Sequence, residues 1–341
     1  TWQDGLNADS PGWLVEHEEP AVRHLALRDL LDYPADDPRL LAARAAAHRA
    51  GAISLVLENM QPEGFWAKPG PGYGPKYHST VWALILLAQM GASVQQDTRV
   101  RQACGYYLDH SLAVDGQISY NGAPGGTIDC LQGNMLWALL TLGCDDPRLE
   151  MALDWMARSN TGEGVAPRST QTKALRETTL RYHAYKSGPD FQCGANDHLA
   201  CAWGAAKVLM AISALPAALR TPLAERAAAR GAEFLFSAPV ETAMWPSISG
   251  TPSANYWKFG FPVFYISDLL QIAAALVGLG YGKDARMAAL LELIRARQDA
   301  DGRWPLEYSY STKTWGSYGR VGKPNPWVTL RALRVLKMAE A

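Results

Sequence analysis

The sequence predicts an all-α protein, folded as a single (α/α) toroid over residues 1–341. Two observations lead to this fold class. A unit of two helices joined by a turn repeats along the chain, and the second helix of each unit is apolar on nearly every side. Units of this kind stack side by side, and about five to six pairs can close a ring.

The second helices of the units are the clearest elements. Their uniform apolarity is typical of helices that are buried on more than one face, so we expect them to form an inner layer. Gly91, Gly143 and Gly280 follow apolar stretches and are typical C-terminal stops, where a left-handed residue is needed. The expected inner helices cover residues 78–91, 130–143, 198–216, 267–280 and 327–337.

The partner helices are amphipathic, with alanine and arginine on the expected solvent face. They cover residues 99–108, 147–158, 221–236 and 285–298. The same helix pairs could also stack into an open solenoid. We favour closure because the second helices are apolar on nearly every side.

Composition excludes several classes of function. The formal net charge is −1 and basic residues are spread evenly, so nothing predicts a nucleic-acid partner. No apolar run is long enough to predict a transmembrane segment, and the N-terminus lacks the pattern of a secretory signal. Five cysteines, an odd number at irregular spacing, favour a reducing cytoplasm over a disulfide framework. The oligomeric state stays open.

Two turns carry a family resemblance. Residues 61–66 (QPEGFW) and 298–304 (QDADGRW, with one extra residue) look like the Q-x-x-x-G-x-W turns of squalene and oxidosqualene cyclases. Further segments resemble a broad bacterial group of prenyltransferase or squalene-oxidase repeat proteins, namely 21–31, 75–82, 130–136 and 327–333. The resemblance implies the toroid of terpenoid cyclases and protein prenyltransferases. It does not imply a reaction, because a fold does not fix function.

The acidic motifs of those enzymes are missing. The chain has neither the Asp-x-Asp-Asp acid of protonating cyclases nor the Asp-Asp-x-x-Asp motif that holds Mg²⁺ and diphosphate. The acidic pairs that are present lie in expected turns, where Asp commonly caps helices. A cyclase that starts by protonating an alkene is therefore not supported.

Cysteine and histidine spacing suggests a metal site. Cys193, His198 and Cys201 lie within nine residues, and Cys130 opens another inner helix. Thiolate and imidazole suit Zn²⁺, and the protein prenyltransferases that the chain resembles hold zinc with Asp, Cys and His. We therefore name Zn²⁺ as the expected cofactor, with these four residues as ligands. Inert core cysteines are the alternative, and Cys104 and Cys144 lie outside the expected site.

Reactive residues recur at the starts of the inner helices. Thirteen residues before the stop glycines lie His78, Cys130 and Ser267, with Asp268 next. Helix N-termini favour anions and lower the pKa of thiols. We predict catalytic roles for His78, Cys130 and Asp268, while helix capping is the simpler reading for Ser267 and Asp268.

Aromatic residues on or near the inner helices predict a cavity for a hydrophobic substrate. The expected substrate-binding residues are Trp82, Trp137, Trp203, Trp257, Tyr265 and Trp327; filling the core is the alternative role. Residues 66–77, 161–193 and 244–262 lack helical periodicity and are candidate lids. The second of these carries the basic residues Arg168, Lys173, Arg176, Arg181 and Lys186, which could meet an anionic substrate.

Three functions remain open from the sequence. The first is an enzyme that acts on a hydrophobic, isoprenoid-like substrate with the help of zinc. The second is a cofactor-free dehydratase, isomerase or lyase that uses Cys, His and Asp as acid–base groups, as in toroidal monoterpenol dehydratases. The third is a non-catalytic protein that binds a hydrophobic ligand or serves as a scaffold.

Overall fold

The computed structural model describes residues 1–166, 182–183 and 186–341, and these are mostly helical. One set of helices is buried on most sides, and we call these the inner helices. They are α2 (Pro20–Asp29), α5 (Thr80–Gln89), α7 (Asp129–Thr141), α10 (Ala202–Ser213), α12 (Leu269–Gly278) and α14 (Pro326–Glu340). The others are α1 (Ser10–Val15), α3 (Pro38–Arg49), α4 (Ala52–Glu58), α6 (Thr98–Ser111), α8 (Arg148–Thr161), α11 (Pro222–Leu235) and α13 (Ala288–Arg295).

Short elements fill the connections. The strand β1 (Val165–Ala166) pairs in parallel with β2 (Tyr182–His183), and β3 (Ser187–Gly188) pairs antiparallel with β4 (Gln192–Cys193). Single 3₁₀ turns cover Pro124–Gly126, Pro189–Phe191, Gly194–Asn196, Ala217–Leu219, Val240–Thr242, Ala254–Trp257, Tyr281–Lys283 and Ala285–Met287.

The predicted all-α class is confirmed, and so is the alternation of apolar and amphipathic helices. In α5 every residue from Thr80 to Ala88 is buried, whereas α8 and α11 bury one face. Gly91, Gly143 and Gly280 all adopt positive φ angles after their helices, as the stop pattern predicts. The helices α5 and α12 start later than expected, because Ser79 and Asp268 adopt extended N-cap conformations, whereas α7 starts one residue earlier, at Asp129.

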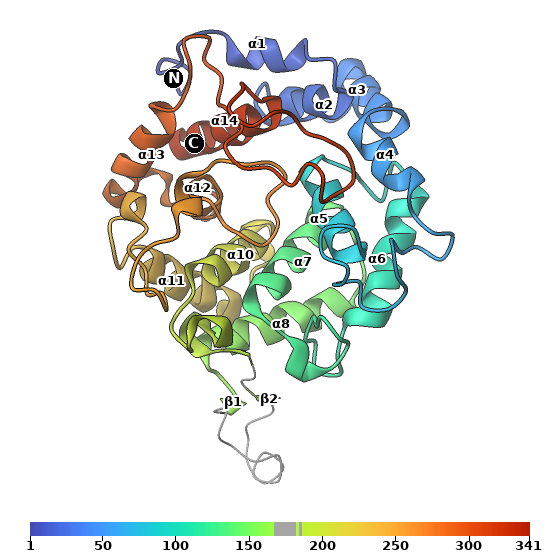
Figure 1. The fold of residues 1–341 in the computed structure, drawn as a ribbon, viewed down its shortest axis with the longest axis vertical. Helices are drawn as coiled ribbons and strands as arrows, with labels where there is room; N and C mark the ends of the chain where they lie inside the picture. Colours follow the sequence, from blue (N-terminus) through green and yellow to red (C-terminus); the bar gives the residue numbers. More distant parts are fainter. Residues whose placement is uncertain (167–181, 184–185) are drawn as a thin grey trace.

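Neighbouring inner helices contact one another in chain order: α5 packs on α7, α7 on α10, α10 on α12, and α12 on α14. The last of them, α14, also contacts α2 near the start of the chain. Figure 1 shows these helices following one another around the middle of the molecule, with α6, α8, α11 and α13 farther out. The middle of the molecule is therefore lined by the inner helices.

The helices α7 and α10 approach unusually closely. A Cβ atom on Gly133 would lie 2.4 Å from the carbonyl carbon of Lys207, so no larger residue fits there without movement. This close crossing fixes the start of α7 against the start of α10. The crossing therefore determines which side chains lie next to one another at the starts of α7 and α10.

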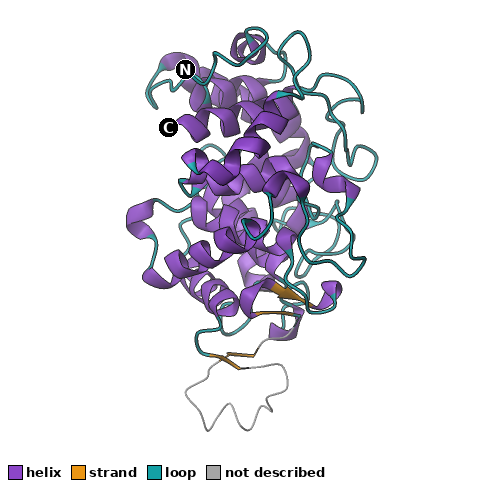
Figure 2. Ribbon diagram, turned by 90° about the vertical axis from the view of Figure 1, so that its left-hand side faces the viewer, coloured by secondary structure: helices purple, strands orange, loops and turns teal. Residues whose placement is uncertain are grey.

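Long and short connections lie at opposite ends of the inner helices. The segments that lead into α5, α7, α10, α12 and α14 are long, while those that leave α5, α7, α10 and α12 are short turns. Figure 2 shows most of the loop length gathered along one side of the molecule. Functional residues are often carried by such loops, so this end is the first place to look for a site.

One helical stretch, Pro38–Glu58, is long and apolar enough to cross a membrane by length and composition alone. Half of the most apolar part of this stretch is buried inside the protein. The helical conformation is interrupted between α3 and α4 at Gly51, where φ is 81°. Core helices pass the same test, so this is weak evidence for a membrane span. All five cysteines are free thiols; the cytoplasmic location stays a prediction.

Candidate active site at the starts of the inner helices

A buried carboxyl group stands at the first position of α7. Asp129 is 4% exposed, and neither of its carboxylate oxygens has a hydrogen-bond partner in the described part of the chain. Its backbone N–H donates to Ser187 Oγ at 2.8 Å, which fixes the position of the residue. Burial, followed by the nearby charge of Cys193, raises the pKa of Asp129 well above its ordinary value, against a smaller opposing effect of the Ser187 hydroxyl. The carboxyl group therefore keeps its proton to a higher pH than an exposed aspartate does.

Cys193 and Cys201 lie together beside this acid. The N–H of Cys193 donates to Leu199 O at 3.1 Å, and that of Cys201 to Phe191 O at 2.9 Å, which holds the two strands of the loop together. The Cys201 thiol donates to the sulfur of Cys193. This hydrogen bond, with backbone N–H groups of Ala195 and Asn196, lowers the pKa of Cys193 to about 6 and raises that of Cys201. Cys193 is therefore a thiolate at neutral pH.

The Asp129 carboxyl group lies against the first turn of α10. A Cβ atom on Gly204 would lie 3.1 Å from the Asp129 Cβ and 3.9 Å from the Cys201 Cβ, so Gly204 leaves room for both. The charge of Cys193 acts on Asp129 across this short space. The acid, Asp129, and the base, the Cys193 thiolate, therefore lie next to each other.

Cys130 follows Asp129 and is a different kind of thiol. Burial raises its pKa to about 12, although a hydrogen bond from the Tyr265 hydroxyl acts in the opposite direction. Cys130 is therefore a neutral thiol. The Tyr265 ring contacts Trp203 at 6.4 Å between centroids, and the Lys76 ammonium group lies 5.3 Å from the ring centroid of Tyr265. We call Asp129, Cys130, Cys193, Cys201 and Tyr265 the acid–thiol cluster.

Buried polar groups without partners gather around this cluster. Such groups are rare in folded proteins, and each asks for an explanation such as a ligand, an ion or water. Besides both oxygens of Asp129, they include Thr127 Oγ1, Trp203 Nε1 and Ser267 Oγ, all close to the starts of α7, α10 and α12. The end with the long loops therefore offers unused donors and acceptors beside aromatic rings.

A layer of buried polar side chains crosses the middle of the inner helices. Lys207 of α10 is fully buried, its ammonium group hydrogen-bonds Gln271 Oε1, and burial lowers its pKa to about 7. About one helical turn before Gln271, at the start of α12, the Asp268 carboxylate pairs with the Arg331 guanidinium group through two N–O contacts of 2.7 and 2.9 Å. We call Lys207, Gln271, Asp268 and Arg331 the polar layer.

Asp268 is fully engaged in this layer. Its Oδ1 accepts from the backbone N–H of Gln271 at 2.8 Å and its Oδ2 from that of Gly260 at 3.2 Å, in addition to the Arg331 pair. These contacts cap α12 and tie it to α14. The predicted catalytic role of Asp268 stays a prediction, and its contacts give it a structural one.

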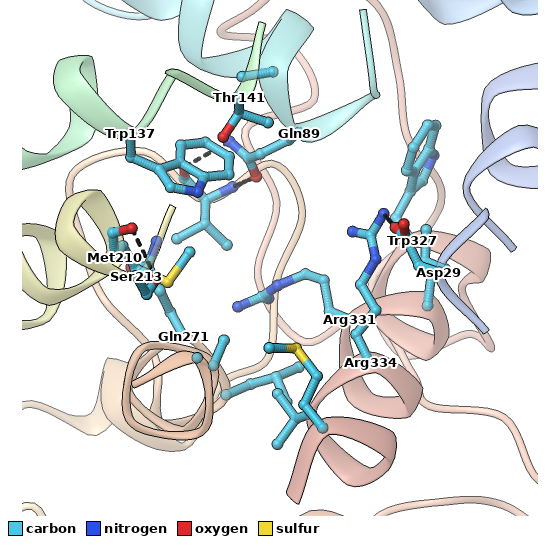
Figure 3. A pocket seen from close by; sticks show the side chains of 18 of the residues that line it. Asp29, Gln89, Trp137, Thr141, Met210, Ser213, Gln271, Trp327, Arg331 and Arg334 are labelled. Carbon is cyan, nitrogen blue, oxygen red and sulfur yellow. Dashed lines mark hydrogen bonds and ion pairs between the residues drawn. The ribbon is translucent and has the colours of Figure 1, made fainter. Parts of the chain in front are cut away.

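A cavity of about 500 Å³ lies beside the polar layer, lined by the last turns of α5, α7 and α10 and by α12 and α14 from their first turns onward. Figure 3 shows Trp137, Met210 and Gln271 on one side and Trp327, Arg334 and Asp29 on the other, with the Arg331 guanidinium projecting between them. Trp137 lies seven residues after Cys130 on α7, which is about 10 Å along the helix axis. The cavity and the acid–thiol cluster are therefore separate places.

The structure divides the predicted substrate-binding residues between these two places and the core. Tyr265 and Trp203 lie at the acid–thiol cluster, and Trp137 and Trp327 line the cavity. Trp82 is buried, with its Nε1 donating to Tyr73 O at 2.9 Å, and Trp257 donates to Glu241 O at 3.0 Å.

His78 lies apart from the other predicted catalytic residues. Its ring meets Trp315 edge-on at 5.2 Å, and its carbonyl oxygen accepts from Trp315 Nε1 at 2.9 Å. Of the candidate lid's basic residues, Arg168, Lys173, Arg176 and Arg181 lie outside the described residues. Lys186 donates to the Tyr120 hydroxyl at 2.8 Å.

The four predicted zinc ligands are only partly brought together. Cys193 and Cys201 share a hydrogen bond, Cys130 lies nearby on α7, and His198 is exposed on the loop beside Cys193. Among the residues that the structure describes, no three His, Cys, Asp or Glu side chains form a group that could hold a metal ion. The zinc site stays a prediction.

Sequence reasoning missed two residues of this region. Asp129 was not singled out, although its place directly before Cys130 is a usable signal. Lys207 lies in an otherwise apolar stretch of α10, where a lone lysine at an inner position could have pointed to a buried charge.

No family model matches the chain, and no curated protein does. The chain is similar to a solved structure titled "Crystal structure of a protein from Actinoplanes", with 16% identity and a TM-score of 0.42 over 97% of this chain and 88% of that one. It is also similar to the type II terpene cyclase MstE from Scytonema, with 14% identity and a TM-score of 0.32 over 88% and 98% of the two chains. A tyrosine-to-phenylalanine variant of MstE gives 16% identity and a TM-score of 0.30 over 88% and 96%. Type II terpene cyclases are among the proteins that the repeats resemble, but likenesses this distant carry no conclusion about function.

Proposed function

We propose that the helix pairs close an (α/α) toroid, and that the protein is an enzyme carrying out acid–base chemistry on a hydrophobic substrate without a cofactor. The reaction class is elimination or isomerisation, as in a dehydratase, lyase or isomerase. The observation that carries the proposal is Asp129, a buried carboxyl group whose oxygens have no hydrogen-bond partner among the described residues, next to the thiolate of Cys193. Perturbed acid and base groups that lie side by side are typical of catalytic sites.

In the proposed resting state Asp129 carries a proton and Cys193 does not, in line with the raised pKa of the carboxyl group and the lowered pKa of the thiol. With an alcohol substrate, Asp129 donates its proton to the hydroxyl oxygen, the C–O bond breaks and water leaves. The Cys193 thiolate then takes a proton from the neighbouring carbon, and the electron pair of that C–H bond forms the alkene. The proton on Cys193 returns to the Asp129 carboxylate and restores the resting state. The net reaction is alcohol to alkene plus water.

The surroundings fit an apolar substrate. The rings of Tyr265 and Trp203 lie beside the cluster, and aromatic faces attract the partial positive charge that develops as the C–O bond breaks. The unpartnered Trp203 Nε1 offers a donor for a substrate oxygen. Cys130 and Tyr265 hydrogen-bond each other and hold the wall of the site in place.

The test is turnover of a panel of hydrophobic allylic alcohols and the matching alkenes in EDTA, with products identified by gas chromatography and mass spectrometry. We expect turnover in the wild type, and a loss of about 100-fold or more in Asp129→Asn and Cys193→Ser. Asp145→Asn and Cys144→Ser, which change the same residue types outside the cluster, are the controls and should keep activity. Turnover that survives in Asp129→Asn would overturn the assignment of the acid.

Zinc is the second candidate. Two thiols and an unpartnered carboxylate are donors that suit Zn²⁺, which favours it. Against it, the described residues do not form a ligand set as they stand, and we derive no step through a metal. Stoichiometric zinc in the purified protein, lost in both Cys193→Ser and Cys201→Ser, would replace the cofactor-free proposal with this one.

A further inference from the structure

We propose that the cavity between the inner helices is a second ligand site, separate from the acid–thiol cluster, which binds an amphipathic anion with a carboxylate head and an aliphatic body. We call it the arginine cavity. Its volume of about 500 Å³ lies in the range of small-molecule sites. Its occupant is independent of the reaction proposed above.

The polar layer separates the two sites. Lys207 is fully buried and does not line the cavity, while its partner Gln271 does. On α10 the cavity begins at Met210, nine residues after Cys201, or about 13 Å along the helix axis. A molecule in the arginine cavity therefore does not reach the sulfur atoms or the carboxyl group of Asp129.

The lining of the cavity carries an excess of positive charge. Together with the partners that they bind, four cationic groups (Arg28, Arg331, Arg334 and Lys337) face three carboxylates (Asp29, Asp32 and Asp268), which leaves one positive charge. Asp29 is already engaged by Arg28 at 3.1 Å or less and by Arg334, and Asp32 by Lys337. The carboxylates are thus occupied, and a single anionic head would complete the charge balance.

An unused hydrogen-bond donor lies on the same wall. Arg334 Nε is buried and has no partner in the described part of the chain. Both Nη atoms of Arg331 donate hydrogen bonds, one to Gly260 O and the other to the Asp268 carboxylate. The guanidinium group projects into the middle of the cavity (Figure 3). Planar guanidinium groups suit a carboxylate head, because two N–H groups can meet its two oxygens.

The remaining wall is apolar. Trp137, Met210, Ala274, Val335 and Met338 come from α7, α10, α12 and α14 and offer an aliphatic chain a continuous surface. Burying such a chain contributes roughly 25 cal/mol per Å² of apolar surface. Charge on one wall and apolar surface on the other select an amphipathic anion over a fully polar or fully apolar ligand.

The test is calorimetric titration of the full chain with decanoate, decanol and decyltrimethylammonium. We expect decanoate to bind, decanol to bind about tenfold or more weakly, and the cation not to bind. Ala274→Phe fills the cavity and should weaken decanoate binding about tenfold or more. Val114→Phe, which adds the same ring at an exposed position, is the control and should bind as the wild type does.

Arg334→Gln should remove the preference for decanoate over decanol while leaving the apolar wall intact. Asp129→Asn should bind decanoate like the wild type, so that a failure of the catalytic proposal leaves this result unchanged. Equal binding of decanol and decanoate, no binding of decanoate, or full binding by Ala274→Phe would overturn the proposal.

Discussion

Gly133 of α7 lies directly against the backbone of Lys207 in α10, since a Cβ atom on the glycine would stand 2.4 Å from the Lys207 carbonyl carbon. This contact brings the start of α7, with its acid, against the start of α10, with its thiol pair. The same contact fixes where Lys207 lies relative to the other residues of the polar layer. The geometry of the proposed active site therefore depends on a glycine more than one helical turn away.

Replacing this glycine should separate the two helices. We expect Gly133→Leu to lower the free energy of unfolding by about 1–3 kcal/mol, because the side chain must push α10 away. Denaturant unfolding followed by circular dichroism measures it. Gly105→Ala on α6 is the matched control, since its Cβ would meet no atom within 4 Å, and it should stabilise the protein by about 0.5–1 kcal/mol. Equal effects of the two changes would contradict the close contact.

Asp268 should behave as a structural residue. Asp268→Ala removes the cap of α12 and leaves the Arg331 guanidinium without its carboxylate, which should cost about 3–5 kcal/mol. Asp284 also caps a helical turn and pairs with an arginine, but both partners lie closer to solvent, so Asp284→Ala should destabilise the protein much less than Asp268→Ala does. A folded Asp268→Ala variant of wild-type stability that lacks turnover would instead support the catalytic role expected from the sequence.

Lys207 should make stability depend on pH. Burial lowers its pKa in the folded protein to about 7, while the unfolded chain keeps a value near 10.5. Between these two values the unfolded state binds more protons than the folded state, so the free energy of unfolding rises with pH. Below pH 7 Lys207 is charged in both states, and the full cost of burying that charge destabilises the folded protein. We expect Lys207→Met to flatten this rise, measured by chemical denaturation at pH 7 and pH 9.5. Lys313→Met, at an exposed position, should leave the slope unchanged.

Cys193 should be the fast-reacting thiol of the acid–thiol cluster. Because the Cys201 thiol holds the pKa of Cys193 at about 6, alkylation by iodoacetamide should rise with a midpoint near pH 6. The measurement is made in a Cys144→Ser background, since Cys144 has a pKa of about 7 through Cys104. Cys201→Ala should move the midpoint to higher pH. An unchanged midpoint would mean that the hydrogen bond does not set the pKa.

The sequence predicted the inner helices well because their signal is local. Glycines in positive-φ positions end α5 and α7, and the apolar run of α12 needs no long-range information. The helix α2 was not recognised as an inner helix, because Arg23, His24 and Arg28 give it an amphipathic pattern. Its polar side chains pair with other parts of the chain, as Arg23 does with the carbonyl oxygens of Val15 and His17.

The candidate site was less predictable for a geometric reason. Cys130 and Trp137 lie on one helix and both looked like parts of one cavity, yet seven residues of rise place them on opposite sides of the polar layer. That Asp129 is buried without a partner depends on how α7 and α10 cross. No pattern along one helix contains that information.

The central claim is that Asp129 is a protonated acid beside a thiolate, and its protonation state can be measured directly. The infrared difference spectrum between the wild type and Asp129→Asn at pH 7 isolates the signal of this one carboxyl group. We predict the carbonyl stretch of a protonated carboxylic acid, which shifts in D₂O. The paired bands of an ionised carboxylate at this pH would contradict the proposed mechanism.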